Sequence, residues 1–294
     1  MDFLQPTTWQ DALALRAERP DALPIAGGTD VMVELNFDKR RPGALLDLGR
    51  VAELREWTAD GELVRLGAGV TYGRVITELA GPLPGLAMAS RTVGSPQIRM
   101  RGTVGGNLGA ASPAGDSHPP LLAADAVVEV ASAERGSREV PVAEFYTGVK
   151  RNALASDELI SAVLVPVPGG PQQFCKIGTR NAMVIAVTAF ALALHPARRA
   201  VGTGIGSAAP TPRRATEAEE FLACELEAGG LWESRAALPE SLAQAFGERV
   251  AAAADPIDDV RGTAAYRRHA LTVMARRAAT WAWDEYRNDE RKAA

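Results

Sequence analysis

Two stretches decide the fold expected for this chain: Pro24-Ile25-Ala26-Gly27-Gly28-Thr29-Asp30-Val31 and, later, Gly102-Thr103-Val104-Gly105-Gly106-Asn107-Leu108. Each joins an apolar run to small residues, so backbone N–H groups can approach an anion without a Cβ in the way. The second stretch continues into Ser112-Pro113-Ala114-Gly115-Asp116. Two such turns converging on one ligand suit a pyrophosphate better than a single phosphate, which indicates a dinucleotide.

The bulk composition limits the partners of the chain. Its 294 residues are 47% apolar, enough for two or three packed units. A net charge of −4 favours neither a nucleic acid nor an anionic membrane surface. The first residues lack a basic region, and no apolar run approaches the length of a membrane span. We therefore expect a cytoplasmic protein.

The cysteines and histidines limit the chemistry further. Cys175 and Cys224 have no C-x-x-C spacing, and two thiolates cannot supply the four ligands of an iron–sulfur cluster. His118, His195 and His269 lie far apart in sequence and do not suggest a zinc site. We expect no metal site and two ordinary buried thiols. Redox chemistry would then require an organic cofactor.

Periodicity in the first half mixes helices with strands. A helix is predicted at 7–19 with Thr8 as its N-cap, and others from Val31 and at 72–80, where the proline- and glycine-rich stretch 81–85 ends the helix. Strands are predicted at 22–26, 45–48, 63–70, 126–130 and 158–166. Gly136 marks a hairpin turn.

The second half has its strands first and its helices afterwards. A Pro/Gly cluster at 166–171 indicates a boundary between units. A small antiparallel sheet is predicted from 174–177, 184–194 and 200–207, followed by helices near 213–227, 239–254 and 261–286. This order indicates an α+β protein.

The first glycine-rich stretch matches neither common nucleotide motif. It lacks the G-x-G-x-x-G spacing, and the chain has no G-x-x-x-x-G-K-[ST] element. In the order strand, Ala-Gly-Gly, Thr-Asp, helix, Thr29 or Asp30 can cap the helix, whose N-terminal amides then face a phosphate. The alternative is that Gly27-Gly28 forms only a tight turn before a capped helix.

The second stretch is more informative. Gly105-Gly106 permits close backbone approach, and Thr103 and Asn107 add short hydrogen-bonding side chains. Asp116 follows at a distance where its carboxylate could accept hydrogen bonds from ribose or ribityl hydroxyls. The alternative is a glycine-rich bend between the strands of an irregular sheet.

A resemblance to a known family rests on segments spread over nearly the whole chain. They are IAGGTD (25–30), QIRMRGTVGGN (97–107), Ala111-Ser112-Pro113, Asp116, KIGTRNAMVIA (176–186), IGSAAPTPRRA (205–215) and DVRGTAAYRR (259–268). In this order and spacing the chain resembles the FAD-binding medium subunit of the molybdenum hydroxylases, which include xanthine dehydrogenase and aerobic carbon monoxide dehydrogenase.

The resemblance implies two domains. Residues 1–170 would form a FAD-binding domain of the PCMH or vanillyl-alcohol-oxidase type, with subdomains at about 1–55 and 56–170. Residues 171–294 would form a carbon monoxide dehydrogenase flavoprotein-like C-terminal domain, a small antiparallel sheet with flanking helices.

The resemblance also implies a set of cofactor-binding residues. Asp116 would bind the FAD chain, Ser112 would shape its loop, and Lys176 and Ile185 would lie near the isoalloxazine, where a lysine can stabilise the anionic reduced flavin. Without the resemblance, Lys176 could be a solvated surface amine and Ile185 plain core. The FAD pyrophosphate would be held by backbone amides of Ala26, Gly27, Gly28, Thr29, Asp30, Val31, Thr103, Val104, Gly105, Gly106 and Asn107.

The implied activity is that of an oxidoreductase subunit. It would bind FAD non-covalently, take electrons from two [2Fe–2S] clusters of a small subunit and pass them to an external acceptor. A large subunit would carry molybdopterin, and the resemblance implies a dimer of heterotrimers. No catalytic acid or base is expected in this chain. Rival interpretations are a flavin-free docking scaffold and a free-standing oxidase of the vanillyl-alcohol-oxidase type.

The chain departs from the family pattern at two positions. Asn36 stands where the helix after the first stretch often carries a lysine, and Met100 stands where an asparagine usually follows Arg99. The cysteine-bearing insertion with which some relatives hold a [4Fe–4S] cluster is missing. FAD is therefore the expected cofactor of this chain.

Overall fold

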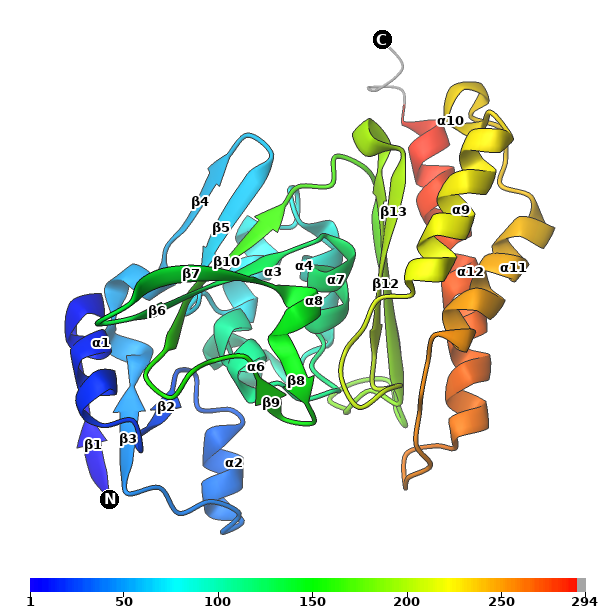
Figure 1. Ribbon diagram of the computed structural model, residues 1–294. Coiled ribbons are helices and arrows are strands. Elements are labelled where there is room, and N and C mark those ends of the chain that lie inside the picture. The colour runs from blue at the N-terminus through cyan, green and yellow to red at the C-terminus, as the bar shows by residue number, and fades with distance from the viewer. Residues whose placement is uncertain (290–294) are drawn as a thin grey trace.

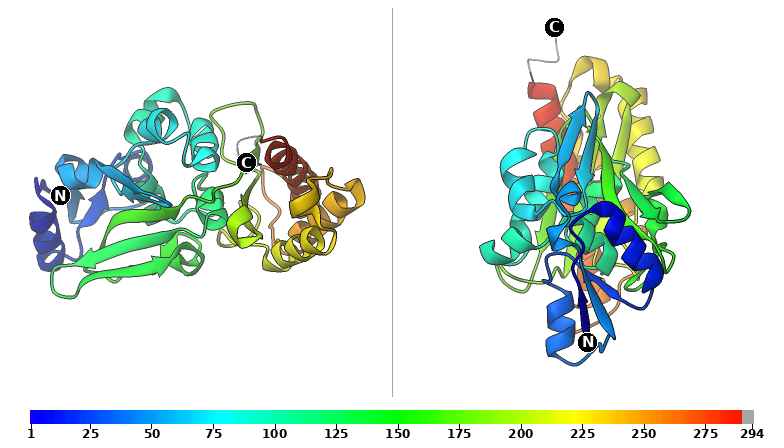
Figure 2. Two further views of the ribbon diagram at one scale, coloured as in Figure 1. Left: turned by 90° about the horizontal axis from the view of Figure 1, so that it is seen from above. Right: turned by 90° about the vertical axis from the view of Figure 1, so that its left-hand side faces the viewer.

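The computed structural model describes residues 1–289, which form two units that lie side by side (Figure 1). Figure 2 shows the N-terminal strands at one end of the molecule and the C-terminal helices at the other. Strands and helices are mixed in the first unit, whereas the second has its sheet first and its helices afterwards. The expected α+β class is confirmed. None of the helices within residues 1–289 has both the length and the apolar character of a bilayer span.

A small parallel sheet at the N-terminus positions the first glycine-rich stretch. Its strands have the spatial order β1-β3-β2, with β1 at Asp2–Leu4, β2 at Leu23–Ile25 and β3 at Ala44–Asp47. The connecting helices are α1 (Trp9–Glu18) and α2 (Val31–Asn36), and short 3₁₀ turns follow at Leu48–Arg50 and Ala52–Arg55. The Thr8 hydroxyl accepts a hydrogen bond from the N–H of Asp11, which confirms the predicted N-cap.

A five-stranded antiparallel sheet forms the centre of the first unit. Its spatial order is β4-β5-β10-β6-β7, with β4 at Trp57–Asp60, β5 at Leu63–Gly67, β6 at Val127–Ser132, β7 at Gly136–Pro141 and β10 at Leu159–Pro166. The β6–β7 hairpin turns at Gly136, as predicted, with a φ of 68° that a residue without a Cβ adopts easily.

Short helices cover this sheet. They are α3 (Tyr72–Glu78), α4 (Pro84–Thr92), α5 (Pro96–Arg101), α6 (Val104–Ala110), α7 (His118–Ala123) and α8 (Val142–Phe145), followed by the hairpin β8 (Tyr146–Gly148) and β9 (Arg151–Asn152). The stretch 81–85 ends α3 as predicted, but Pro84 also begins α4. A proline suits the first turn of a helix because its missing N–H has no partner there.

The second glycine-rich stretch forms a helix, so the prediction of a turn is wrong. Thr103 is the N-cap of α6, and its Oγ1 accepts a hydrogen bond from the N–H of Gly106 at 2.9 Å. A Cβ on Gly105 would lie 2.5 Å from the Cβ of Ala68. The glycines are therefore compatible with helix here because close packing against the end of β5 outweighs their low helix propensity.

The second unit is a three-stranded antiparallel sheet covered by helices on one face (Figure 1). Its strands are β11 (Gln172–Ile177), β12 (Thr188–His195) and β13 (Ala200–Gly206), with a 3₁₀ turn at Pro196–Arg198. Its helices are α9 (Thr216–Ala228), α10 (Leu231–Ser234), α11 (Glu240–Ala252) and α12 (Ala264–Asn288). The strand predicted at 184–194 begins only at Thr188, because residues 178–187 form the loop from β11 to β12.

The two units join where α7 packs against β13. Gly202, Gly204 and Gly206 alternate along this strand and so share one face of the sheet. A Cβ on Gly204 would overlap the carbonyl oxygen of Pro119 and lie 2.6 Å from its carbonyl carbon. Backbone therefore meets backbone at this joint, and only glycine fits.

Polar side chains reinforce the joint. Asp125, which follows α7, forms ion pairs with Arg198 and Arg214 of the second unit. Arg214 also pairs with Glu219 at 2.7 Å, and His195 Nε2 donates to the carbonyl of Ala123 at 3.0 Å. The joint is thus hydrogen-bonded as well as packed.

Candidate functional site

The loop after β2 presents backbone donors that have no internal acceptor. Within residues 1–289, the N–H groups of Gly27 to Val31 donate no hydrogen bond. Gly28 has a φ of +77°, which favours glycine. Backbone donors are normally paired, so this run of free N–H groups at a helix start suits an anionic ligand.

The expected capping of α2 by Thr29 or Asp30 is wrong. Asp30 occupies the N-cap position, but its backbone is in the αR region (φ −101°, ψ −50°) and its side chain makes no capping hydrogen bond. Capping normally requires an extended N-cap backbone. The start of α2 therefore keeps its N–H groups available.

The first amides of α6 differ from those of the loop before α2. Val104 N–H donates to the carbonyl of Val70 at 3.3 Å, and Gly105 N–H donates to that of Ala68 at 3.2 Å. The N–H of Gly106 is used by the Thr103 hydroxyl. What α6 contributes instead is the exposed backbone of Gly106, where a Cβ would lie 3.9 Å from Ala26 Cβ and would displace the Thr103 hydroxyl, 2.9 Å away.

The fold brings the two glycine-rich stretches together. A Cβ on Gly27 would lie 2.5 Å from the carbonyl carbon of Arg101 and 3.0 Å from Gly102 Cα. Gly106 faces Ala26 across the same contact. The loop 26–31 and the start of α6 therefore lie next to each other and can contact the same ligand.

A buried ion pair lies where the two units meet. Lys176 Nζ on β11 is 2.6 Å from Asp116 Oδ2, and each side chain is only 8% exposed. Lys176 is therefore not a solvated surface amine. Burial raises the pKa of Asp116, an effect partly offset by the ammonium of Lys176. Asp116 Oδ1 is also buried and has no hydrogen-bond partner within the described chain.

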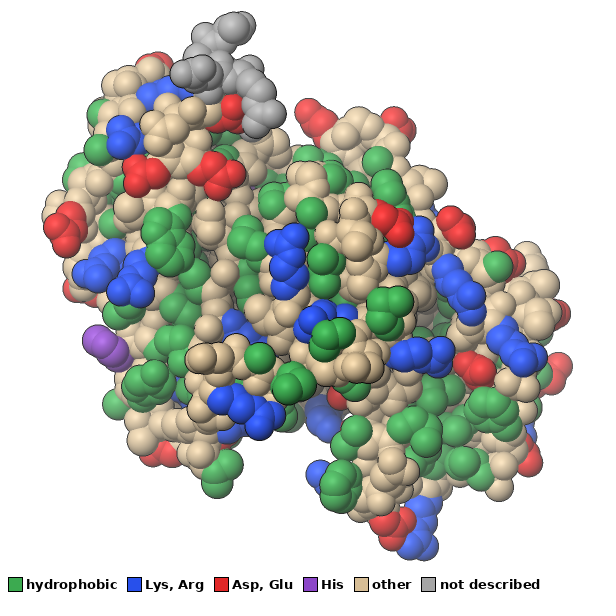
Figure 3. All heavy atoms as spheres, turned by 180° about the vertical axis from the view of Figure 1, so that it is seen from behind, with side chains coloured by type: hydrophobic (Ala, Val, Ile, Leu, Met, Phe, Trp, Pro, Cys, Tyr) green, Lys and Arg blue, Asp and Glu red, His purple; other side chains and the backbone are tan. Residues whose placement is uncertain are grey.

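The remaining predicted side chains lie in loops and at helix ends of the two units. Ser112 Oγ accepts a hydrogen bond from the N–H of Ala114, and Asn107 Oδ1 accepts one from the Ser117 hydroxyl at 2.6 Å. Ile185 lies in the loop 178–187 and is 60% exposed, so it is not core. Seen from behind, the surface is hollowed between the two units, with Lys and Arg side chains at its border (Figure 3).

Sequence reasoning missed Thr92 at the end of α4. Its hydroxyl lies 2.8 Å from the carbonyl oxygen of Ala89 and 3.3 Å from Asp116 Oδ2, so the two acceptors share one proton, and its carbonyl accepts a hydrogen bond from Lys176 Nζ at 3.2 Å. The sequence signal was weak, because α4 itself was not predicted and a threonine at a helix end is common.

Two expectations about cysteine are corrected. Cys224 is exposed and Cys175 is half-buried, so neither is a fully buried thiol. Burial raises the pKa of Cys175 to about 11, which keeps it protonated at neutral pH. Within residues 1–289, no cluster of three or more His, Cys, Asp or Glu side chains is placed to hold a metal ion.

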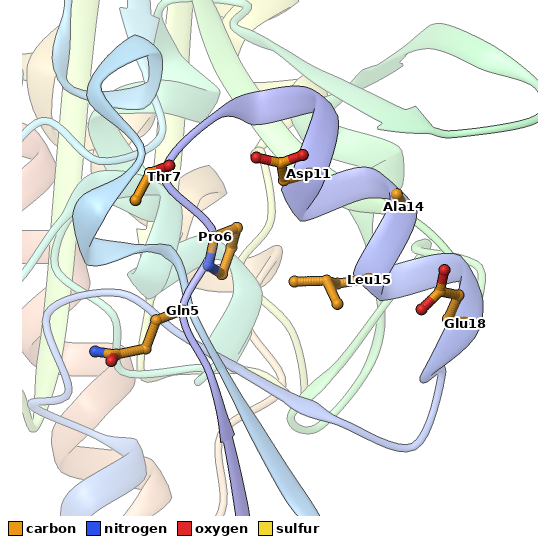
Figure 4. A pocket seen from close by; sticks show the side chains of 7 residues that line it. All are labelled: Gln5, Pro6, Thr7, Asp11, Ala14, Leu15 and Glu18. Atoms are coloured by element: carbon orange, nitrogen blue, oxygen red, sulfur yellow. The ribbon is translucent and has the colours of Figure 1, made fainter.

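A separate surface hollow lies along α1. It has a volume of about 390 Å³ and is lined by Gln5, Pro6, Thr7, Asp11, Ala14, Leu15 and Glu18 (Figure 4). None of these residues belongs to the glycine-rich stretches or to the ion pair.

His118 follows the Asp116 loop and is fully buried. Its Nδ1 lies 2.7 Å from the Tyr146 hydroxyl. In a neutral imidazole the unprotonated ring nitrogen can accept a hydrogen bond from this hydroxyl. Burial lowers the pKa of His118 to about 3. The folded chain therefore carries this histidine uncharged.

We expect this burial to make stability pH-dependent. The pKa of His118 is about 3 in the folded chain and about 6.5 in the unfolded chain. The stability that depends on a neutral His118 is therefore complete above pH 6.5 and is lost as the pH falls toward 3. At pH 5 the free energy of unfolding should be lower by about 2 kcal/mol than at pH 7. Urea titrations of His118→Asn should show a smaller difference in the free energy of unfolding between pH 7 and pH 5 than wild type shows. His269→Asn replaces an exposed histidine and is the control, which should keep the wild-type difference.

Free amides beside a glycine-rich helix, together with a buried carboxylate–lysine pair, define an α+β protein built to hold a nucleotide cofactor. Two family models cover most of the chain. Residues 1–168 match the FAD binding domain in molybdopterin dehydrogenase, and residues 173–282 match the CO dehydrogenase flavoprotein C-terminal domain. The chain belongs to the family of FAD-binding subunits of the molybdopterin dehydrogenases. The resemblance drawn from the motifs is thus confirmed.

Curated relatives agree with this family. The xanthine dehydrogenase FAD-binding subunit of Escherichia coli O157:H7 is 31% identical over 286 residues, covering 94% of this chain and 93% of the relative. The carbon monoxide dehydrogenase medium chain of Afipia carboxidovorans is 30% identical, with 94% of each chain covered. A 36% identical match to caffeine dehydrogenase subunit beta of Pseudomonas sp. CBB1 spans 57% of this chain and 58% of that protein.

Solved structures share the whole fold. Quinoline 2-oxidoreductase from Pseudomonas putida 86 superimposes with a TM-score of 0.86 at 25% identity, over 97% of both chains. Carbon monoxide dehydrogenase from Oligotropha carboxidovorans superimposes with a TM-score of 0.83 at 29% identity, over 97% of this chain and 98% of the other. The similarity therefore includes both units.

Proposed function

We propose that this chain is the electron-transferring FAD subunit of a molybdenum hydroxylase complex. The observation that carries the proposal is the run of unbonded N–H groups from Gly27 to Val31, in a loop that lies beside the exposed Gly106 of α6. An anion with two adjacent phosphates suits these donors. Family membership makes FAD the cofactor that supplies such a diphosphate.

The residues present fit FAD. Asp116 Oδ1 is a buried acceptor without a partner, as expected for an atom that receives a ligand hydroxyl. Ser112 and Asn107 already hold neighbouring loops in place through their side chains. Lys176 would place its positive charge near the ring, and Ile185 would offer an exposed apolar surface to it. FAD, when bound, can accept two electrons singly and pass them on.

The amide contacts proposed for α6 need one change. Because Val104, Gly105 and Gly106 use their N–H groups internally, we propose that α6 offers the diphosphate the exposed backbone of Gly106, with Thr103, Val104, Gly105 and Asn107 forming the helix start around it. The diphosphate would then receive its hydrogen bonds mainly from Ala26, Gly27, Gly28, Thr29, Asp30 and Val31. We also propose domains at 1–170, with subdomains at about 1–55 and 56–170, and at 171–294.

The partners follow from the family. We propose a large molybdopterin-binding subunit and a small [2Fe–2S] subunit, arranged as a dimer of heterotrimers in the cytoplasm. Named relatives include medium chains, such as that of carbon monoxide dehydrogenase, which supports a multisubunit assembly. Oxidation of substrate would take place on the large subunit, and this chain would deliver electrons to an external acceptor.

The visible spectrum tests the proposal. The chain should be co-expressed with its neighbouring genes and purified without heating. We expect flavin bands that persist after gel filtration, plus broad iron–sulfur absorption in whatever co-purifies. A colourless chain within an intact complex would indicate a docking scaffold, and substrate turnover by the isolated chain would indicate a free-standing oxidase. Either result contradicts the proposal.

A further inference from the structure

The last turn of α4 contacts both members of the buried ion pair. The Thr92 carbonyl accepts a hydrogen bond from Lys176 Nζ at 3.2 Å, and the Thr92 hydroxyl, which also lies 2.8 Å from the carbonyl of Ala89, is 3.3 Å from Asp116 Oδ2. Lys176 has three N–H donors, and these two bonds to Asp116 and Thr92 account for its contacts within residues 1–289. Thr92 therefore contacts both the ammonium and the carboxylate of the pair.

An arginine on the next helix holds this turn. Arg99 Nη1 on α5 lies 3.2 Å from the carbonyl of Arg91, and 3.0 Å from the carbonyls of Val93 and Gly94. These carbonyls flank Thr92 on both sides. Carbonyls at a helix C-terminus lack intrahelical partners, so a cation that binds them stabilises the turn. The Arg99 side chain forms no ion pair with a carboxylate of the described chain.

We propose that Arg99 is a positioning residue of the flavin site. It fixes the end of α4, and Thr92 in turn fixes Lys176 and Asp116. This inference rests on the proposed function, because it concerns the side chains that would face the cofactor. The hydrogen bonds of the Arg99 guanidinium go to backbone carbonyls and not to Asp116 or Lys176, so its effect on these two side chains passes through Thr92.

The first test needs no cofactor. In FAD-free protein, Arg99→Gln should raise the hydrogen-exchange rates of a peptide covering residues 91–95 about ten-fold, since each lost hydrogen bond favours local opening. The matched control is Arg91→Gln, which removes the same charge from an exposed side chain without hydrogen bonds inside residues 1–289. Unchanged exchange in Arg99→Gln would overturn the proposal.

The second test uses FAD itself. Titration of FAD-free chain should give a Kd about ten-fold higher for Arg99→Gln than for wild type. Arg99→Lys should recover part of the affinity, because an ammonium can still bind a carbonyl. If Arg99→Gln does not fold, Thr92→Val tests the same step, with Thr92→Ser as the restoring variant.

A double-mutant cycle separates positioning from general stability. Arg99→Gln should shift the reduction potential of bound FAD in the wild-type chain but not in a Lys176→Met background. Equal shifts in both backgrounds would show that Arg99 does not act through Lys176. If wild-type chain binds no FAD, the proposed function fails with this inference. If wild type binds FAD and Arg99→Gln matches it, only the inference fails.

Discussion

Gly106→Val is expected to abolish FAD binding while the chain keeps its fold. A Cβ at this position meets no backbone of another segment, since only Thr103 Oγ1 and Ala26 Cβ come within 4 Å. The side chain would displace the Thr103 hydroxyl that caps α6 and would fill the space beside the loop 26–31. Loss of such a cap costs about 1 kcal/mol, so the chain stays folded. We expect the Kd for FAD to rise about 100-fold or more, measured by titration and by the flavin content of purified protein.

Two other glycines provide the controls for this result. Gly81→Val should keep its flavin, because nothing lies within 4 Å of a Cβ there. Gly105→Ala should lower the free energy of unfolding, because its Cβ would lie 2.6 Å from the carbonyl oxygen of Ala68. If Gly106→Val retains wild-type flavin content, α6 does not line the diphosphate site.

Gly204→Ala is expected to cause the largest loss of stability, about 4 kcal/mol or more. Replacing glycine by alanine usually stabilises a chain by reducing the entropy of its unfolded state. Here the added Cβ would overlap the carbonyl of Pro119, and both groups belong to packed backbone. Urea unfolding should show the loss, and the melting temperature should fall by about 10 °C.

The same change should weaken FAD binding indirectly. Asp116 belongs to the first unit and Lys176 to β11 of the second, so a displaced α7 separates the ion pair. Gly148→Ala is the matched control, because a Cβ there makes only ordinary contacts, 3.6 Å from Arg151 Cδ. Equal stability of the Gly204→Ala and wild-type chains would show that α7 and β13 are not packed backbone to backbone.

The periodic segments of the chain could be predicted well. The helix capped by Thr8, the hairpin at Gly136 and the order of strands before helices in the second half all follow from local patterns. Local patterns failed where packing decides the conformation. Gly105 and Gly106 were expected in a turn, yet they lie in α6 because that helix must approach Ala68 closely.

The candidate site likewise contains residues that the sequence predicted and residues that only the packing of the chain brings to it. The sequence indicated the loop 26–31, Asp116 and Lys176, because small residues and a few charged side chains are read directly from their motifs. It could not show that Asp116 and Lys176 pair with each other, since 60 residues separate them. The sequence did not predict Thr92 and Arg99 as site residues. Their hydrogen bonds, to the ion pair and to the end of α4, form only after α4 and α5 have packed together.

Sequence by itself therefore determined the family, the cofactor class and the two glycine-rich stretches, since each depends on residue types at short spacing. Tertiary structure alone decided which N–H groups stay free, which charges are buried together, and why β13 carries glycine on one face. The physical reason is that burial, pairing and steric overlap are properties of surfaces that meet only after the chain has folded.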